Sequence, residues 1–122
     1  MADSRYVIKS SEQGNVEISM HVITSIIGIA TLKVDGVSCL GNGINSENIE
    51  KQPAKALQKT VRICKNEEGI SVDIALNLKF GSEIMDVVPA VQEKVKETVM
   101  DMIGIDIDTV NIRIIGIDAE EA

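Results

Sequence analysis

A strict alternation of apolar and polar side chains over residues 70–80 constrains the fold more than any other feature of this sequence. The apolar positions are Ile70, Val72, Ile74, Leu76, Leu78 and Phe80, and the positions between them are Ser71, Asp73, Ala75, Asn77 and Lys79. Side chains of a strand point alternately to its two faces, so this period of two predicts a long antiparallel strand. We expect the even-numbered side chains to be buried and the odd-numbered ones to be exposed.

Two segments have the apolar spacing of amphipathic helices. Ser19 is a suitable N-cap for a helix over residues 20 to about 34, and we expect this helix to be heavily buried because most of its circumference is apolar. The second helix runs from Gly81-Ser82 to about residue 103 and ends at Gly104. Its apolar stripe consists of Ile84, Val88, Val91, Val95, Val99 and Met102. Pro89 favours a kink or an irregular first turn, unless Asp86 is the N-cap and Pro89 lies in the first turn.

Shorter extended segments surround these elements. We expect short strands over residues 5–10, 16–18 and 37–40, and a strand over residues 60–65 that the turn at 66–69 joins to the long strand. A final strand over residues 108–117 has Val110, Ile112 and Ile114 on one face. Residues 44–57 are polar and basic and contain Pro53, which indicates a loop and leaves a helical turn within it as an open alternative.

The order β-α-β-β-α-β predicts an α+β fold, a two-layer sandwich in which two helices pack on one face of a mostly antiparallel sheet. A core rich in Ile and Val suits this class, since aromatic residues make up only 2% of the chain. We divide the 122 residues into a short N-terminal arm or edge strand at 1–13, a single domain at 14–117 and an acidic tail at 118–122.

Charge is distributed unevenly along the chain. The formal net charge of -7 opposes adhesion to nucleic acid or to anionic lipid. Basic residues nevertheless gather in the middle, where no acidic residue interrupts the segment 51–65, and acidic residues gather at the C-terminal end. We interpret four of the basic residues as a partner-contact surface: Lys51, Lys55, Lys59 and Arg62. The alternative interpretation is a solvated surface without a partner.

No set of residues has the spacing of a catalytic, metal or cofactor site. His21 is the only histidine, and we expect it at the surface without a second metal ligand nearby. Cys39 and Cys64 form no C-x-x-C motif, and their apolar neighbours predict two buried, reduced thiols. Asp106 and Asp108 are too few for a hard-metal site. We therefore predict no catalytic residue, no metal, no cofactor and no enzymatic activity.

A KH-like, RNA-binding module is a further alternative, because a small α+β domain with a basic stripe can bind RNA. The stripe has no interleaved aromatic residues and the chain has no G-x-x-G clamp, so no nucleic-acid partner is expected. The N-terminus opens no apolar run typical of a signal peptide. The apolar stretch at 22–34 is too short to span a bilayer, which predicts a cytoplasmic protein without direct membrane insertion.

Two blocks of sequence resemble a known family. The first comprises residues 14–19, then Val22, Ile23, Ile26 and Ala30, and closes on residues 34–37. The second comprises residues 72–74, Phe80-Gly81, Ile84, Val87, residues 91–96, residues 102–104 and residues 110–112. Their order and spacing are similar to the alkaline-shock-protein family, and the resemblance covers residues 14–37 and 70–117. Members occur mainly in Gram-positive bacteria and respond to cell-envelope stress.

The resemblance implies an accessory role without catalysis, homo-oligomerisation and, in some members, peripheral attachment to the membrane through a separate anchor protein. Other members are linked to lipid-precursor metabolism, which leaves an alternative open: a regulatory subunit that docks on an enzyme of fatty-acid or lipid-precursor metabolism. The chain departs from the family pattern in the short, basic segment 38–59 and at Pro89. Partner identity is therefore not fixed by the resemblance.

Overall fold

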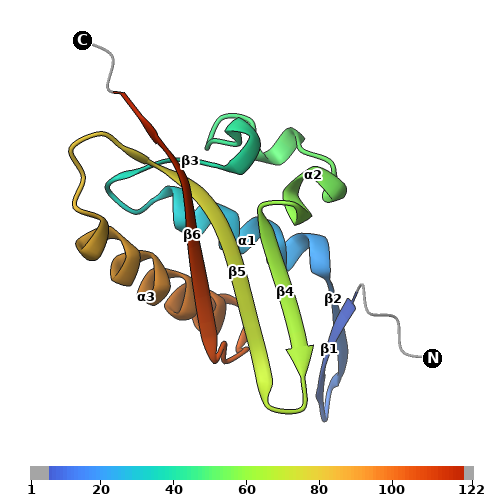
Figure 1. Cartoon of the computed structure of the whole chain (residues 1–122). Helices are drawn as coiled ribbons and strands as arrows, with labels where there is room; N and C mark the ends of the chain where they lie inside the picture. Colours follow the sequence, from blue (N-terminus) through green and yellow to red (C-terminus); the bar gives the residue numbers. More distant parts are fainter. Residues whose placement is uncertain (1–5, 120–122) are drawn as a thin grey trace.

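The computed structural model describes the backbone of residues 6–119 and the side chains of residues 10–119. Its elements, in chain order, are β1 (Tyr6–Ser11), β2 (Gly14–Ser19), α1 (Met20–Leu32), β3 (Val37–Leu40), α2 (Ala54–Gln58), β4 (Val61–Asn66), β5 (Gly69–Lys79), α3 (Ile84–Ile103) and β6 (Thr109–Asp118) (Figure 1). The predicted α+β fold is confirmed, and the short helix α2 begins within the segment 44–57, where the sequence left a helical turn open. Arg5 of the first expected strand and residues 120–122 of the expected acidic tail lie outside the described residues.

The long strand β5 is the centre of the main sheet. Strand β6 runs parallel to it, with Val72 opposite Val110 and Ile74 opposite Ile112. Strand β4 pairs antiparallel with the first half of β5, and β3 pairs antiparallel with its second half. Because β6 occupies one edge of β5 along almost its whole length, β3 and β4 lie end to end along the other edge. The sheet is therefore mixed, with α3 as the crossover that parallel pairing requires.

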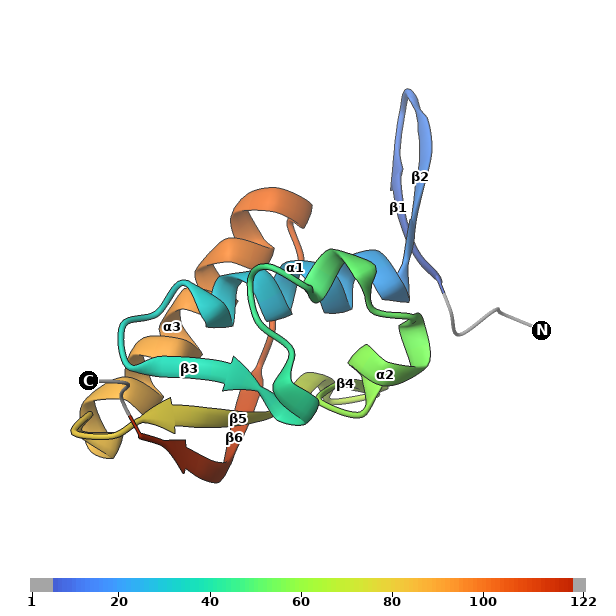
Figure 2. The ribbon, with the colours of Figure 1, turned by 90° about the horizontal axis from the view of Figure 1, so that it is seen from above.

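Helices α1 and α3 pack against each other and cover one face of the sheet. Figure 2 shows α1 above β3, β5 and β6, while α3 slants across the molecule from the level of these strands to above α1. The β1–β2 hairpin forms a separate two-stranded sheet that projects from one end of the molecule (Figure 2). The opposite face of the main sheet carries exposed polar side chains such as Arg62, Asp73 and Arg113. We call it the open face.

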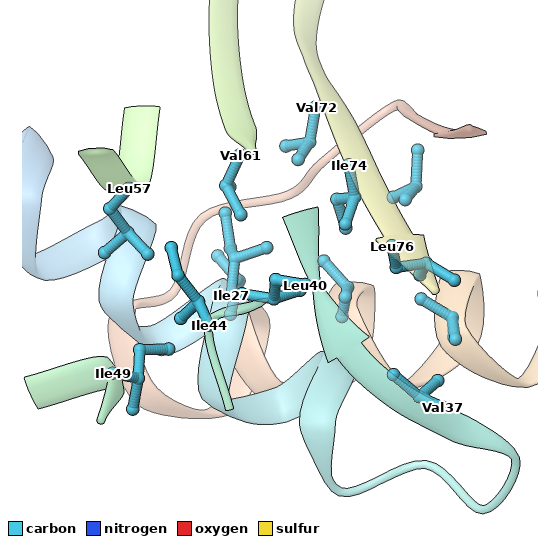
Figure 3. Close-up of a cluster of buried hydrophobic side chains, with 14 of the residues drawn as sticks. Ile27, Val37, Leu40, Ile44, Ile49, Leu57, Val61, Val72, Ile74 and Leu76 are labelled. Carbon is cyan, nitrogen blue, oxygen red and sulfur yellow. The ribbon is translucent and has the colours of Figure 1, made fainter. Parts of the chain in front are cut away.

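The hydrophobic core lies between the helices and the covered face of the sheet (Figure 3). The segment 44–57, which the sequence predicted to be a polar loop, contributes Ile44, Ile49 and Leu57 to this core, each at most 3% exposed. The loop prediction was wrong in this respect. Scattered single apolar residues in polar surroundings have no period, so their burial leaves no signal in the local sequence pattern.

The predicted alternation along β5 is confirmed at its centre, where Val72, Ile74, Leu76 and Leu78 are at most 1% exposed. Phe80 was predicted to be buried, and this was wrong, because its side chain is 72% exposed. Strand β5 ends at Lys79, and the chain turns away through Gly81, whose φ of 94° is readily available only to glycine. Phe80 therefore lies beyond the covered face and outside the alternating pattern.

Helix α3 begins at Ile84 and buries a stripe made of Val87, Val91, Val95 and Val99. The predicted stripe was wrong at its ends and in its first turns. Ile84 and Met102 are 44% and 66% exposed because they extend past the sheet, and Val88 is only half-buried. The helix runs through Pro89, which lies at an exposed position, and ends as predicted at Gly104, with φ of 77°.

Helix α1 begins as predicted at Ser19, whose Oγ accepts a hydrogen bond of 3.1 Å from the backbone N–H of Val22. It ends at Leu32, two residues earlier than predicted. Heavy burial around the helix was only partly right, because Val22 is 46% exposed and Ile29 half-buried. Ile29 still packs against the edge of the core, whereas Val22 does not.

Candidate functional site

The open face is built from the side chains that alternate with the core residues of β4, β5 and β6. In one row across the sheet, Arg62 of β4 lies opposite Asp73 of β5, which lies opposite Asn111 of β6. Asn111 Nδ2 donates a hydrogen bond of 2.8 Å to Asp73 Oδ1. In the next row, Arg113 of β6 lies opposite Ala75. Pairing thus brings two guanidinium groups to opposite flanks of β5.

A hollow of about 560 Å³ lies over Ala75 on this face. Its polar lining consists of Lys59, Thr60, Arg62, Asp73, Asn111 and Arg113. The methyl group of Ala75 is short, whereas the side chains on the flanking strands are long, so the middle of the face is lower than its sides. The lining contains three cationic side chains and one carboxylate. An anionic group is the ligand that this charge balance favours.

An irregularity in β6 adds an apolar side chain to the open face. The pairing of β5 with β6 shifts register between Leu76 and Asn77, so that Ile114 and Gly116 face consecutive β5 residues and Ile115 is extra. Ile115 is 51% exposed. Ile115 Cδ1 lies 3.3 Å from the position that a Cβ on Gly41 would occupy. Because Gly41 directly follows β3, the side chain of Ile115 reaches across β5 towards the end of β3.

Three of the four predicted partner-contact residues lie together in the structure, and the fourth, Lys51, lies apart from them. Lys55, Lys59 and Arg62 line a second hollow of about 640 Å³, between α2, β4 and the start of α1. Lys59 and Arg62 line both hollows, so the two adjoin at these residues. Lys51 is exposed at the end of a 3₁₀ turn and lines neither hollow.

We define the basic surface as Lys55, Lys59, Arg62 and Arg113. Arg113 was missed by the sequence analysis because it lies far from the other three in the chain. A signal was present, since Val110, Ile112 and Ile114 were expected on one face of the last strand, which leaves Asn111 and Arg113 on the other. Only the pairing of β6 with β5 shows that this other face adjoins Arg62.

The cysteines and the histidine differ from their predicted environments. Cys64 is exposed and Cys39 half-buried, so the prediction of two buried thiols was wrong. Cys64 lies opposite Ser71 on the open face. Cys39 Sγ accepts a hydrogen bond of 3.2 Å from Asn77 Nδ2 and donates one of 3.6 Å to Asp118 Oδ2. His21 was expected at the surface but is half-buried, and among the described residues its Nδ1 has no hydrogen-bond partner.

Metal-ligand clusters and membrane-spanning helices are both absent from the described part of the chain. Over residues 10–119, His, Cys, Asp and Glu side chains form no group of three or more that could hold a metal ion. Among the helices of the same part, none combines the length and the apolar character needed to cross a membrane.

Comparison with known proteins identifies the family. The chain is 34% identical over 104 residues to the uncharacterized protein YqhY of Bacillus subtilis (strain 168), a match that covers 85% of this chain and 77% of that protein. It is 36% identical over 109 residues to the uncharacterized protein Spy1535 of Streptococcus pyogenes serotype M6, covering 88% and 82% of the two chains. No solved structure matches the chain significantly. The model of the alkaline-shock-protein family, described as having a cell envelope-related function, matches residues 8–119, so the chain belongs to this family, as the sequence resemblance predicted.

Proposed function

We propose that this protein is a non-enzymatic accessory protein of the cell-envelope stress response, and that it acts by associating with other protein chains, including copies of itself. The family is related to the cell envelope, and the family model indicates no enzymatic class. A cytoplasmic location, peripheral to the membrane through an anchor protein, is part of the same proposal.

The observation that carries this proposal is the basic surface on a strongly acidic protein. The net charge of -7 repels most anionic surfaces at long range, whereas the basic surface attracts an acidic group at short range. Complementary charges of this kind set the encounter rate and the register of an association. Both hollows are lined by exposed cationic side chains, as suits contact with an acidic group of another chain.

Sedimentation velocity of the wild type and of a charge-reversal variant tests the proposal. We expect the wild type to sediment as a species larger than a monomer at low salt. The variant Lys55→Glu, Lys59→Glu, Arg62→Glu should lose this association, and the wild type should lose part of it at high salt because exposed charges are screened beyond ~8 Å at physiological ionic strength.

A matched control reverses three exposed lysines outside the basic surface: Lys33, Lys94 and Lys96. This control changes the net charge by the same amount, so it should keep the association. A wild type that is monomeric at every salt concentration contradicts self-association. The alternative role, a regulatory subunit docking on an enzyme of fatty-acid or lipid-precursor metabolism, predicts that monomeric result.

A further inference from the structure

We propose that the hollow over Ala75 binds the acidic residues Glu120 and Glu121 of a second copy of this chain, so that copies associate head to tail. The inference rests on the proposed function, because it uses the basic surface as an association site. It adds the occupant of the site, the residues that contact it and the symmetry of the assembly.

Charge and geometry of the hollow match this occupant. Arg62 and Arg113 lie on the two strands that flank β5, and the backbones of those strands are about 10 Å apart, since neighbouring strands are separated by ~4.8 Å. Adjacent residues of an extended segment point in opposite directions. A segment that lies along β5 can therefore direct Glu120 towards one guanidinium group and Glu121 towards the other, in the bidentate geometry that arginine favours.

The floor of the hollow fits the residues next to these two acids. Ala75 leaves room for a backbone to approach the sheet. Ile115 is exposed further along β6, outside the lining of the hollow, and offers an apolar contact there. The acidic pair is flanked by Ala119 and Ala122, whose side chains are small and apolar. A bulky flanking residue would collide with the side chains that rise on both sides of Ala75.

The end of β6 lies away from the hollow of its own copy. Strand β6 passes Arg113 and continues to Asp118 at the far end of the sheet. There the Asp118 carboxylate accepts hydrogen bonds from Ser38 Oγ at 2.5 Å and from Cys39 Sγ at 3.6 Å. These bonds hold Asp118 opposite Lys79, at the end of the sheet away from Ala75 of the same copy, which favours the hollow of a neighbouring molecule as the acceptor.

Binding of this kind uses two different surfaces, one from each copy. Such a heterologous contact does not close on itself in a dimer, and it produces a ring or an open chain. The size of the assembly should therefore increase with protein concentration unless a ring closes.

Two variants that each lack one half of the contact test the inference. The first, Arg62→Glu with Arg113→Glu, has an impaired hollow and intact acids, and the second, Glu120→Gln with Glu121→Gln, has an intact hollow and no acids. Each alone should sediment as a monomer at low salt. An equimolar mixture should form a dimer and nothing larger, because only one contact, from the acids of the first variant to the hollow of the second, can form.

Several outcomes would overturn the inference. If the glutamine variant associates as the wild type does, or if the mixture stays monomeric, the hollow does not bind these acids. If the wild type associates and only the variants of the basic surface lose that association, the proposed function stands and this occupant is wrong. Unchanged melting temperatures of both variants would confirm that the loss of association is not caused by unfolding. The variant Lys33→Glu, Lys94→Glu changes the net charge as much as Arg62→Glu with Arg113→Glu does, so it is the control for net charge.

Discussion

The two faces of the central strand β5 are made by neighbouring residues and have opposite properties. On the covered face, Ile74 and Leu76 are almost completely buried under α1 and α3. On the open face, Asp73 and Lys79 are exposed. Burying a large apolar side chain contributes about 1.5–3 kcal/mol, whereas an exposed charge pair contributes about 0–1 kcal/mol. The covered face therefore determines stability, and the open face is free to carry the charges that an association requires.

The largest expected effect lies on the covered face. Ile74→Ala should lower the free energy of unfolding by about 2–4 kcal/mol, since it leaves a cavity in a fully packed core. Val95→Ala on α3 should have a smaller effect of the same sign, because it removes fewer atoms. Chemical denaturation measures both variants. The exposed substitutions Asp73→Ala and Glu97→Ala are the controls, and equal stability of all four variants would show that the faces are wrongly assigned.

An intermediate effect is expected at the end of the sheet where β5 and β6 both begin. Asp108 Oδ2 accepts a hydrogen bond of 2.8 Å from the backbone N–H of Ile70, and the Asp108 N–H donates one of 2.9 Å to the Ile70 carbonyl. Asp108→Ala removes the first bond and leaves the N–H of Ile70 to water. We expect a loss of about 1 kcal/mol in urea unfolding. Asp106→Ala is the neighbouring exposed control, and a loss as large for it as for Asp108→Ala would refute the specific role of this bond.

The smallest effect is expected at Phe80, where the sequence pattern and the structure disagree. Its side chain is 72% exposed, so Phe80→Ser should change the free energy of unfolding by less than about 0.5 kcal/mol. A buried phenylalanine would instead lose about 3–5 kcal/mol on truncation. Comparing the thermal unfolding of Phe80→Ser with that of Leu78→Ala separates an exposed from a buried Phe80, because Leu78 is buried on the covered face.

Much of the covered face could be predicted from the sequence because burial imposes a period. The alternation along β5 and the cap at Ser19 are local patterns, and both are confirmed. The errors occur where an element extends past its neighbours, as at Phe80 and Met102, since a residue keeps its phase in the pattern but has nothing to pack against. The burial of Ile49, by contrast, depends on a contact with α1 that no local pattern encodes. Ile49 Cδ1 packs so closely on Gly28 of α1 that a Cβ on this glycine would lie only 2.8 Å away.

The candidate site could be predicted only in part. Lys55, Lys59 and Arg62 are close in sequence and stay close in the structure. Arg113 joins them through the pairing of β6 with β5, and no local pattern encodes which strands become neighbours. The extra residue Ile115 also interrupts the alternation of β6, so a period of two applied to this strand assigns the wrong face to the residues after it.

The parallel pairing of β5 with β6 has a consequence for the order of folding. The β4–β5 hairpin closes through a tight turn, whereas β6 reaches β5 only after the whole of α3 has been made. Hairpins form in about 1–10 μs, and contacts between distant parts of a chain form more slowly because more chain entropy is lost. During synthesis one edge of β5 therefore stays unpaired until residues 109–118 leave the ribosome, and it can pair with a nascent neighbour. Pulse-labelled hydrogen exchange should show amides of β4 protected before those of β6, and simultaneous protection would exclude this order.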